Sequence, residues 1–226
     1  HSESEVNEDL NLSILGNVPH LEFLEDNNFA ENSLFNMVDT FEEDSGESVF
    51  AFHLRESLRN LCTSIRFLDY KGSKGFFVLT SSVPGEGKTL SSLLIAKTLS
   101  EIGVSVLLID ADMRKPQLHK RLDMDNIKGL SNYLIGEANI DEIEQKVSQY
   151  PNLKIITAGT RPPNPINLLS SSKLNELFKD LDNRKDIDFV LIDCPPTIGL
   201  SDSALMAKNC DGIIYMISLA KVERNL

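Results

Sequence analysis

The chain has 226 residues, of which 41% are hydrophobic, and this suits one α/β domain with its own core plus an appendage. Its formal net charge is −12, which argues against binding to the phosphate backbone of DNA or RNA. No apolar run is long enough to cross a bilayer, and three cysteines without a C-x-x-C pair favour a reducing compartment over a disulfide framework.

The negative charge is concentrated at the N-terminal end. Residues 1–54 contain thirteen Asp or Glu and no Lys or Arg, whereas the rest of the chain has 21 acidic and 22 basic residues. Acidic segments of this kind are usually solvated and partly disordered. We therefore divide the chain into an acidic leader, residues 1–46, and a domain over residues 47–226.

The first element expected after the leader is an amphipathic helix from Glu47 to Phe67. Its apolar residues recur at steps of three and four, which is the period of one helix face. They are Phe50, Leu54, Leu58, Leu61, Ile65 and Leu68.

The most informative stretch is a strand, a glycine-rich turn and a helix start. Phe76 to Leu79 is a short apolar run, and the helical spacing resumes after Lys88-Thr89. Such a turn lets backbone N–H groups and the positive end of the following helix converge on one anion. The residues expected to bind a nucleotide are Pro84, Gly85, Glu86, Gly87, Lys88, Thr89 and Leu90. The general pattern begins with glycine, where this chain has Ser82.

Two further apolar runs end in carboxylates. Val104 to Ile109 is followed by Asp110 and Asp112, and Phe189 to Ile192 is followed by Asp193. Continuous apolar runs are typical of strands buried on both faces of a parallel sheet. Because ligands of open α/β sheets bind beyond the carboxyl ends of the strands, these carboxylates are expected beside Lys88 and Thr89, where they suit Mg²⁺.

The remaining pattern alternates strands and helices and predicts a doubly wound, mostly parallel sheet with helices on both faces. Short helices and turns are expected between Pro116 and Gly136. Beyond them, we expect a helix over 140–147, a strand over 153–156, a proline-rich loop over 161–165, a helix over 174–181, a helix over 201–208 capped by Ser201, and a buried strand over 212–217.

Four segments in this order resemble the bacterial tyrosine kinases, cytoplasmic P-loop kinases that partner exopolysaccharide and capsule chain-length regulators. They are Ser81 to Thr89, Leu108 to Pro116, Gly159 to Pro165 with Leu168 to Ser171, and Leu191 to Pro196. Related partition and septum-positioning ATPases carry an extra lysine five residues before the loop lysine. Val83 stands at that position here, which favours the kinase branch.

The resemblance implies a role for each site residue. Lys88 and the loop backbone would hold the phosphates of ATP, with Thr89 and Asp110 near Mg²⁺ and Asp193 holding Mg²⁺ through water. Asp112 is the better candidate to orient or deprotonate the tyrosine hydroxyl, although the choice between Asp110 and Asp112 stays open. Arg114 would offset charge on the transferring phosphoryl group.

The same resemblance predicts partners. The expected helix of this family carries a Glu-x-x-Arg-x-x-Arg pattern that joins subunits into a ring. Glu56 and Arg59 match it and Cys62 does not, which weakens the expected self-association. Ile14 to His20 resembles the segment after the last membrane helix, so the protein is expected at the cytoplasmic face of the inner membrane with its chain-length regulator, while this fragment itself is soluble.

The leading hypothesis is a Mg-ATP-dependent protein-tyrosine kinase that autophosphorylates and regulates polysaccharide synthesis and export. The alternatives are a P-loop ATPase switch and a nucleotide-binding module that partners the membrane protein without phosphotransfer. The family's usual acceptor, a tyrosine-rich tail, is not in this sequence, whose tyrosines are scattered at Tyr70, Tyr133, Tyr150 and Tyr215.

Overall fold

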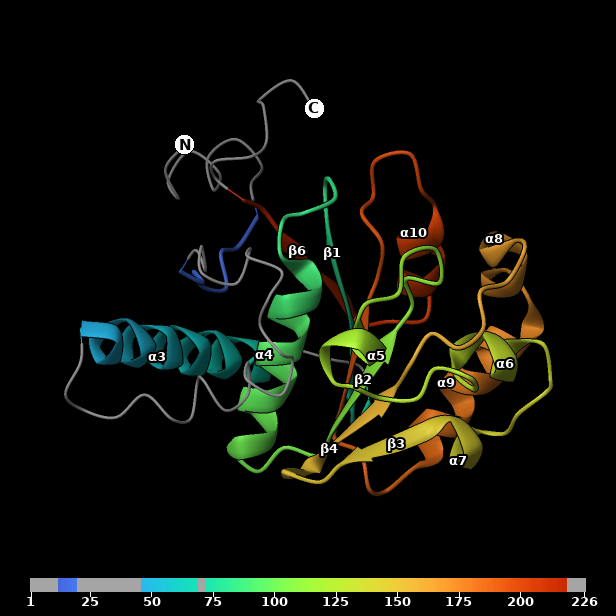
Figure 1. Cartoon of the computed structure of the whole chain (residues 1–226), viewed down its shortest axis with the longest axis horizontal. Coiled ribbons are helices and arrows are strands. Elements are labelled where there is room, and N and C mark those ends of the chain that lie inside the picture. The colour runs from blue at the N-terminus through green and yellow to red at the C-terminus, as the bar shows by residue number, and fades with distance from the viewer. Residues whose placement is uncertain (1–11, 20–45, 69–71, 219–226) are drawn as a thin grey trace.

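A six-stranded, mostly parallel sheet forms the centre of the molecule (Figure 1), in a computed structural model that describes residues 12–19, 46–68 and 72–218. The strand order is β3-β4-β2-β5-β1-β6, and only the β3–β4 pair is antiparallel. The strands are β1 (Gly75–Ser81), β2 (Val106–Asp110), β3 (Glu144–Val147), β4 (Tyr150–Ile156), β5 (Phe189–Asp193) and β6 (Gly212–Met216). The doubly wound parallel sheet predicted from the sequence is confirmed.

Helices cover both faces of this sheet (Figure 1). On one face lie α3 (Gly46–Arg66) and α4 (Lys88–Glu101), and on the other lie α6 (Leu130–Leu134), α8 (Pro165–Leu169), α9 (Ser172–Asn183) and α10 (Asp202–Ala207). The short α5 (Leu118–Arg121) follows β2. The expected helix over 174–181 thus lies within α9, and the strand over 153–156 within β4.

The central strands are buried on both faces because they sit between two helix layers. Every residue of β1, β2 and β5 is buried. Alternate residues point to opposite layers, so that Phe76 and Val78 pack with α9 while Phe77 and Leu79 pack with α4. Each fully buried side chain of this kind stabilises the fold by about 1.5–3 kcal/mol.

Helix α3 confirms the expected amphipathic helix within one residue at each end. Its buried stripe consists of Leu54, Leu58, Leu61, Cys62 and Ile65. Leu68 is half-buried, and the side chain of Phe50 lies outside the described residues. The Cys62 thiol lies 3.7 Å from the carbonyl oxygen of Ile95 in α4, so this position faces the core.

The segment 140–147 is not one helix, and that prediction is wrong. Helix α7 (Ile140–Ile143) begins with a capping box between Asn139 and Glu142, and the chain becomes extended at Glu144. In β3 the Glu144 carboxylate meets the Lys154 ammonium of β4 at 2.9 Å and the Arg184 guanidinium at 3.1 Å. Pairing with β4 and these two ion pairs override the helical spacing of the apolar residues.

Two smaller expectations need correction near the C-terminal end. Strand β6 lies at the edge of the sheet, and β1 is its one neighbour among the described strands. Only Ile214 of this strand is therefore buried. Ile213 and Tyr215 are 51% and 39% exposed. Ser201 precedes α10 but its side chain makes no capping hydrogen bond.

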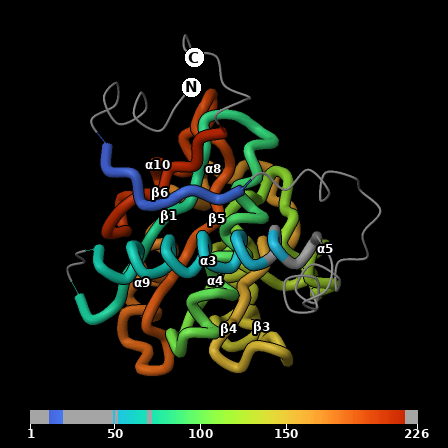
Figure 2. The backbone as a smooth tube through the Cα atoms, turned by 90° about the vertical axis from the view of Figure 1, so that its left-hand side faces the viewer, coloured from blue at the N-terminus to red at the C-terminus, as the bar shows by residue number. Residues whose placement is uncertain are grey.

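Residues 12–19 lie across α4 and β6 and run beside α3 (Figure 2). Leu15 and Val18 pack against the core on the α4 side, and Gly16 sits against Leu61. With β6 and α4 the segment lines a cavity of about 280 Å³. The rest of the acidic leader, residues 1–11 and 20–45, lies outside the described residues, as does Tyr70.

The three cysteines pack in or against the core. Cys62 and Cys194 are fully buried and Cys210 is half-buried. Burial raises the pKa of the Cys62 and Cys210 thiols to about 12 and that of Cys194 well above its ordinary value. Within the part that the structure describes, no helix combines the length and hydropathy that a bilayer-spanning segment needs.

Candidate functional site

The turn between β1 and α4 has the geometry of an anion site. Gly85 and Gly87 adopt positive φ angles of 83° and 84°, a conformation that glycine reaches without steric cost. Helix α4 begins directly at Lys88 with no acidic residue in its first turn. The positive end of a 14-residue helix therefore points into a turn that brings backbone N–H groups together. We call residues 82–89 the phosphate loop.

The Glu86 side chain stabilises this loop from beneath. Its carboxylate is buried and accepts hydrogen bonds from the backbone N–H of Val83 at 2.9 Å and of Ser218 at 3.0 Å. Only the backbone of Glu86 is therefore left to contact a nucleotide. Pro84 is exposed and Leu90 is half-buried at the two ends of the expected binding segment.

Lys88 and Asp112 lie together, as the rule of strand ends predicts. The Lys88 ammonium is 3.4 Å from Asp112 Oδ2, and both side chains are largely shielded from solvent. The other oxygen of Asp112 accepts the backbone N–H of Lys115 at 3.0 Å. One Asp112 oxygen is thus held by the chain while the other faces the loop lysine.

Asp110 is committed to the backbone around it. It is fully buried, and its carboxylate accepts the N–H groups of Asp112, Gln117 and Leu118 at 3.1, 3.2 and 3.1 Å. Burial, followed by the neighbouring charge of Asp193, raises its pKa to about 8. Asp110 therefore organises the turn after β2.

Asp193 lies beside Asp110 at the end of the adjacent strand. The two residues are register partners of the parallel β2–β5 pair, and the N–H of Ala111 donates to the Asp193 carbonyl at 2.8 Å. Burial raises the pKa of Asp193 to about 6, while the charge of Lys88 opposes the shift. Neither carboxylate oxygen has a hydrogen-bond partner of ordinary length among the described residues, although the Thr89 hydroxyl lies near enough to lower the pKa as well. A buried carboxylate without a partner is suited to a cation or to water bound to one.

The residues present fit a magnesium ion. Mg²⁺ is usually held by one or two carboxylates together with phosphate oxygens and waters. The Thr89 hydroxyl at the start of α4 and the unpartnered Asp193 carboxylate are ligands of this kind. No cluster of three or more His, Cys, Asp or Glu with metal-binding geometry occurs in the described ranges, and an ion shared with phosphate does not need one.

Arg114 is held by a partner that sequence reasoning missed. Its Nε and Nη2 atoms donate to the two carboxylate oxygens of Asp202 at 3.1 and 3.2 Å. Asp202 is fully buried in the first turn of α10, whereas the Arg114 side chain is 31% exposed. The guanidinium is thus fixed in direction and keeps a solvent-facing side. The sequence showed an acidic residue, Asp202, at the expected helix start after Ser201, but this position did not indicate that it would bind Arg114.

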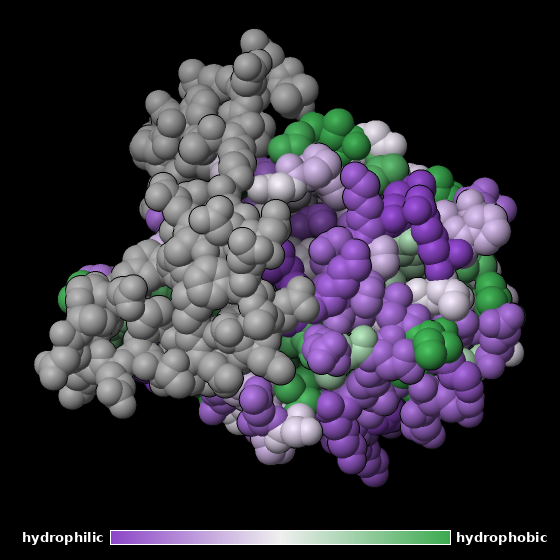
Figure 3. Space-filling model, viewed as in Figure 1, coloured by the Kyte–Doolittle hydropathy of each residue, from purple (hydrophilic) through white to green (hydrophobic). Residues whose placement is uncertain are grey.

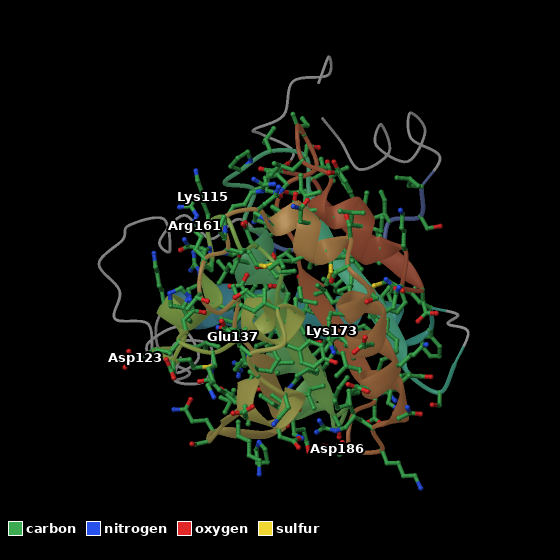
Figure 4. All side chains as sticks on the ribbon, turned by 90° about the vertical axis from the view of Figure 1, so that its right-hand side faces the viewer. Lys115, Asp123, Glu137, Arg161, Lys173 and Asp186 are labelled. Carbon is green, nitrogen blue, oxygen red and sulfur yellow. The ribbon has the colours of Figure 1, made fainter. Side chains whose placement is uncertain are left out.

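The loop after β4, which leads into the expected proline-rich segment 161–165, is fixed on α6. The Asn132 side chain accepts from Gly129 and Thr160, and the Ser131 hydroxyl donates to the Thr160 carbonyl at 2.6 Å. Because β2 and β4 are parallel neighbours, the loops after them meet at one end of the sheet. In Figure 4 Arg161 and Lys115, from these two loops, lie at the same end of the molecule. The part of the domain visible in Figure 3 is mostly hydrophilic, with apolar areas between the polar ones.

Comparison with known sequences gives one consistent set of relatives. A family model described as an AAA domain matches residues 78–221. The chain is 33% identical over 169 residues to tyrosine-protein kinase YwqD of Bacillus subtilis (strain 168), a match that covers 75% of this chain and 70% of the relative. It is 36% identical over 172 residues to putative tyrosine-protein kinase CapB of Staphylococcus aureus, covering 76% and 74%.

Solved structures agree with this set. The kinase domain of the Escherichia coli tyrosine kinase ETK matches with a TM-score of 0.77 at 26% identity, covering 94% of this chain and 80% of that one. The septum site-determining protein MinD of Pyrococcus horikoshii OT3, complexed with Mg-ADP, matches with a TM-score of 0.53 at 26% identity, covering 63% and 57%. The fold is therefore that of P-loop nucleotide-binding proteins.

Proposed function

The chain belongs to the bacterial tyrosine-protein kinases, and on that premise we propose that it transfers the γ-phosphoryl group of Mg-ATP to tyrosine hydroxyls of protein. The observation that carries this proposal is the meeting of three strand ends. They bring the phosphate loop with Lys88, the Asp112 carboxylate and the unpartnered Asp193 to one place. The polysaccharide link rests on the family resemblance.

We assign the proton transfer to Asp112. In the reaction the tyrosine oxygen forms a bond to the γ-phosphorus, the bond to the β-phosphate oxygen breaks, and the hydroxyl proton must move to a base. Asp112 has one oxygen held by the backbone and one facing Lys88. Asp110 already accepts three backbone N–H groups. This difference supports Asp112 over Asp110 as the base.

The loop and the two cationic side chains stabilise charge. Without a nucleotide the Lys88 ammonium lies beside Asp112. When a nucleotide binds, the ammonium leaves Asp112 and pairs with the β- and γ-phosphates. Arg114, aimed by Asp202, offsets charge on the transferring group. Thr89 and, through water, Asp193 would hold magnesium, with Asp110 near them, and the ion would neutralise phosphate charge.

We further place this activity at the cytoplasmic face of the inner membrane, with a chain-length regulator as partner on the same or a separate polypeptide. The seating of residues 12–19 on the domain supports this, since that segment resembles the one after the last membrane helix. Glu56 and Arg59 form an exposed ion pair at 3.0 Å on the outer side of α3, where another subunit can reach them. Buried Cys62 adds no charge to that surface.

The test follows γ-labelled ATP with Mg²⁺ and records label on protein tyrosine and as free phosphate in one reaction. It uses the natural full-length protein, with Lys88→Met and Asp112→Asn as variants and Lys173→Met, an exposed lysine paired with Glu176 in α9, as the control. We expect label on tyrosine in the parent and the control. Asp112→Asn should bind ATP but lose transfer by about 10²–10⁴-fold.

Lys88→Met should lose both transfer and the thermal stabilisation that Mg-ATP gives the parent. The unfolding temperature without nucleotide separates loss of binding from loss of fold. Free phosphate without phosphotyrosine would replace the kinase with an ATPase switch. If Mg-ATP stabilises Lys88→Met as much as the parent, Lys88 does not belong to a phosphate site and the assignment is wrong.

A further inference from the structure

Strand β6 touches the phosphate loop at three points. The Tyr215 hydroxyl lies 3.0 Å from the Ser82 hydroxyl. The Met216 methyl lies 3.5 Å from the point where a side chain on Gly87 would begin. The Ser218 N–H, just beyond the strand, donates to the buried Glu86 carboxylate at 3.0 Å. Ser82, Glu86 and Gly87 of the loop thus each lie beside β6 or the residue Ser218 just beyond it.

The Tyr215 contact belongs to a chain of hydroxyls. The Tyr215 hydroxyl also lies 2.8 Å from Thr197 Oγ1, and Thr197 Oγ1 donates to the Ser81 carbonyl at 3.2 Å. Since each hydroxyl has one proton to give, the direction follows: Ser82 donates to Tyr215, Tyr215 to Thr197, and Thr197 to the Ser81 carbonyl. Successive hydrogen bonds of this kind reinforce one another.

The backbone ties the same residues together. The N–H of Thr197 donates to the Ser81 carbonyl at 2.8 Å, and the N–H of Ile198 donates to the Ser82 carbonyl at 3.2 Å. The turn after Asp193 is therefore hydrogen-bonded to Ser82, the first residue of the phosphate loop, and to Ser81 before it. Tyr215 is the side chain that reaches both segments from β6, where it stands opposite Thr80 in the register.

We propose that Tyr215 is a positioning residue for the phosphate loop and acts through Ser82, an inference that rests on the proposed nucleotide site. The general pattern has glycine at the position of Ser82, and in this chain the serine hydroxyl is used to anchor the start of the loop. Fixing that start holds the backbone N–H groups of the loop in the arrangement that receives the phosphates.

Removing the hydroxyl should therefore weaken nucleotide binding. Tyr215→Phe keeps the ring and leaves Ser82 and Thr197 without their shared partner. Loss of one such hydrogen bond corresponds to roughly a three- to tenfold higher Kd for Mg-ATP. The KM for ATP should rise by a similar factor while kcat changes less.

The matched control is Tyr133→Phe. The Tyr133 hydroxyl also makes a short hydrogen bond, donating at 2.8 Å to Asp180 of α9, which is not part of the phosphate loop. The experiment measures Mg-ATP affinity by calorimetry and the unfolding temperature without nucleotide for the parent, both tyrosine variants, Ser82→Ala, and the Ser82→Ala/Tyr215→Phe double variant.

We expect weaker binding for Tyr215→Phe and Ser82→Ala, no additional loss in the double variant, and parent-like binding for Tyr133→Phe. Parent-like binding by Tyr215→Phe would overturn the inference, and so would losses that simply add in the double variant, because Tyr215 would then act independently of Ser82. If the parent itself binds no Mg-ATP, the proposed function fails first. If the parent binds and only the Tyr215 effect is absent, this inference fails alone.

Discussion

Two acidic side chains, Asp110 and Asp193, are buried side by side at the ends of neighbouring strands. An isolated buried carboxylate is costly, and a second one nearby raises the cost of ionising either. Their raised pKa values, about 8 and about 6, follow from burial first. The pair therefore prefers to carry fewer charges until a cation arrives.

This pair predicts a pH dependence of stability in the nucleotide-free protein. The pKa of Asp110 is about 8 in the folded chain against an ordinary value of 3.8, so the folded state retains a proton that the unfolded state has lost. The free energy of unfolding should therefore fall as the pH rises from about 4 to about 8, by at most about 1.4 kcal/mol per pH unit for this group. Urea titrations across this range measure it.

Asp110→Asn is the comparison for that measurement, because an amide cannot ionise. Its stability should change less with pH over the same range than that of the parent. An identical slope in parent and variant would show that Asp110 titrates normally in the folded state.

At the level of single residues, the sequence predicted those whose position follows from a local rule. Lys88, Asp112 and Asp193 stand at a helix start, just after a strand end and at a strand end, and the parallel sheet brings such ends together. Asp202 and Tyr215 were not predictable in this way. Asp202 is 88 residues from Arg114, and Tyr215 is 133 residues from Ser82, so their roles depend on tertiary packing alone.

Among the elements, β3 shows how side-chain pairing overrides periodicity. Ile140, Ile143 and Val147 have the spacing of a helix face, but only Ile143 is fully buried. Glu144 instead joins Lys154 and Arg184, and Asp186 closes the same network at the surface labelled in Figure 4. The local sequence of 140–147 does not predict that Glu144 will pair with Lys154 on β4 and Arg184 after α9.

Glu144→Gln should therefore destabilise the protein by about 1–3 kcal/mol, because it leaves two largely shielded cations with a weaker partner. Chemical denaturation with a fixed m-value measures the change. The matched control is Glu142→Gln, whose partner Lys128 is exposed, and this substitution should cost less than about 1 kcal/mol. Equal effects at the two positions would mean that the network does not hold β3 in place.

For the molecule as a whole, the mostly parallel sheet and its two helix layers were predictable, whereas the seating of residues 12–19 was not. Alternation of apolar runs with helical spacing fixes a doubly wound sheet. The segment 12–19 carries no regular secondary structure, and its acidic surroundings suggested a solvated leader. Its attachment rests on a few apolar contacts with α3, α4 and β6.

Leu15→Ser and Val18→Ser together should thus lower the free energy of unfolding by roughly 1–3 kcal/mol, since both side chains are half-buried against the core. Ile127→Ser, at a side chain that is 72% exposed, serves as the control and should have little effect. Thermal unfolding followed by circular dichroism compares them. A double variant as stable as the control would show that the segment contributes nothing to the fold.

The two fully buried thiols, those of Cys62 and Cys194, report on opening of the folded chain. Thiols attack alkylating reagents as thiolates, and burial keeps these two protonated and inaccessible. Cys62 can be modified only when α3 leaves α4, and Cys194 only when the strand that carries Asp193 opens. The order in which the two are alkylated therefore records which layer of the protein opens first, and a bound nucleotide should slow Cys194 more than Cys62.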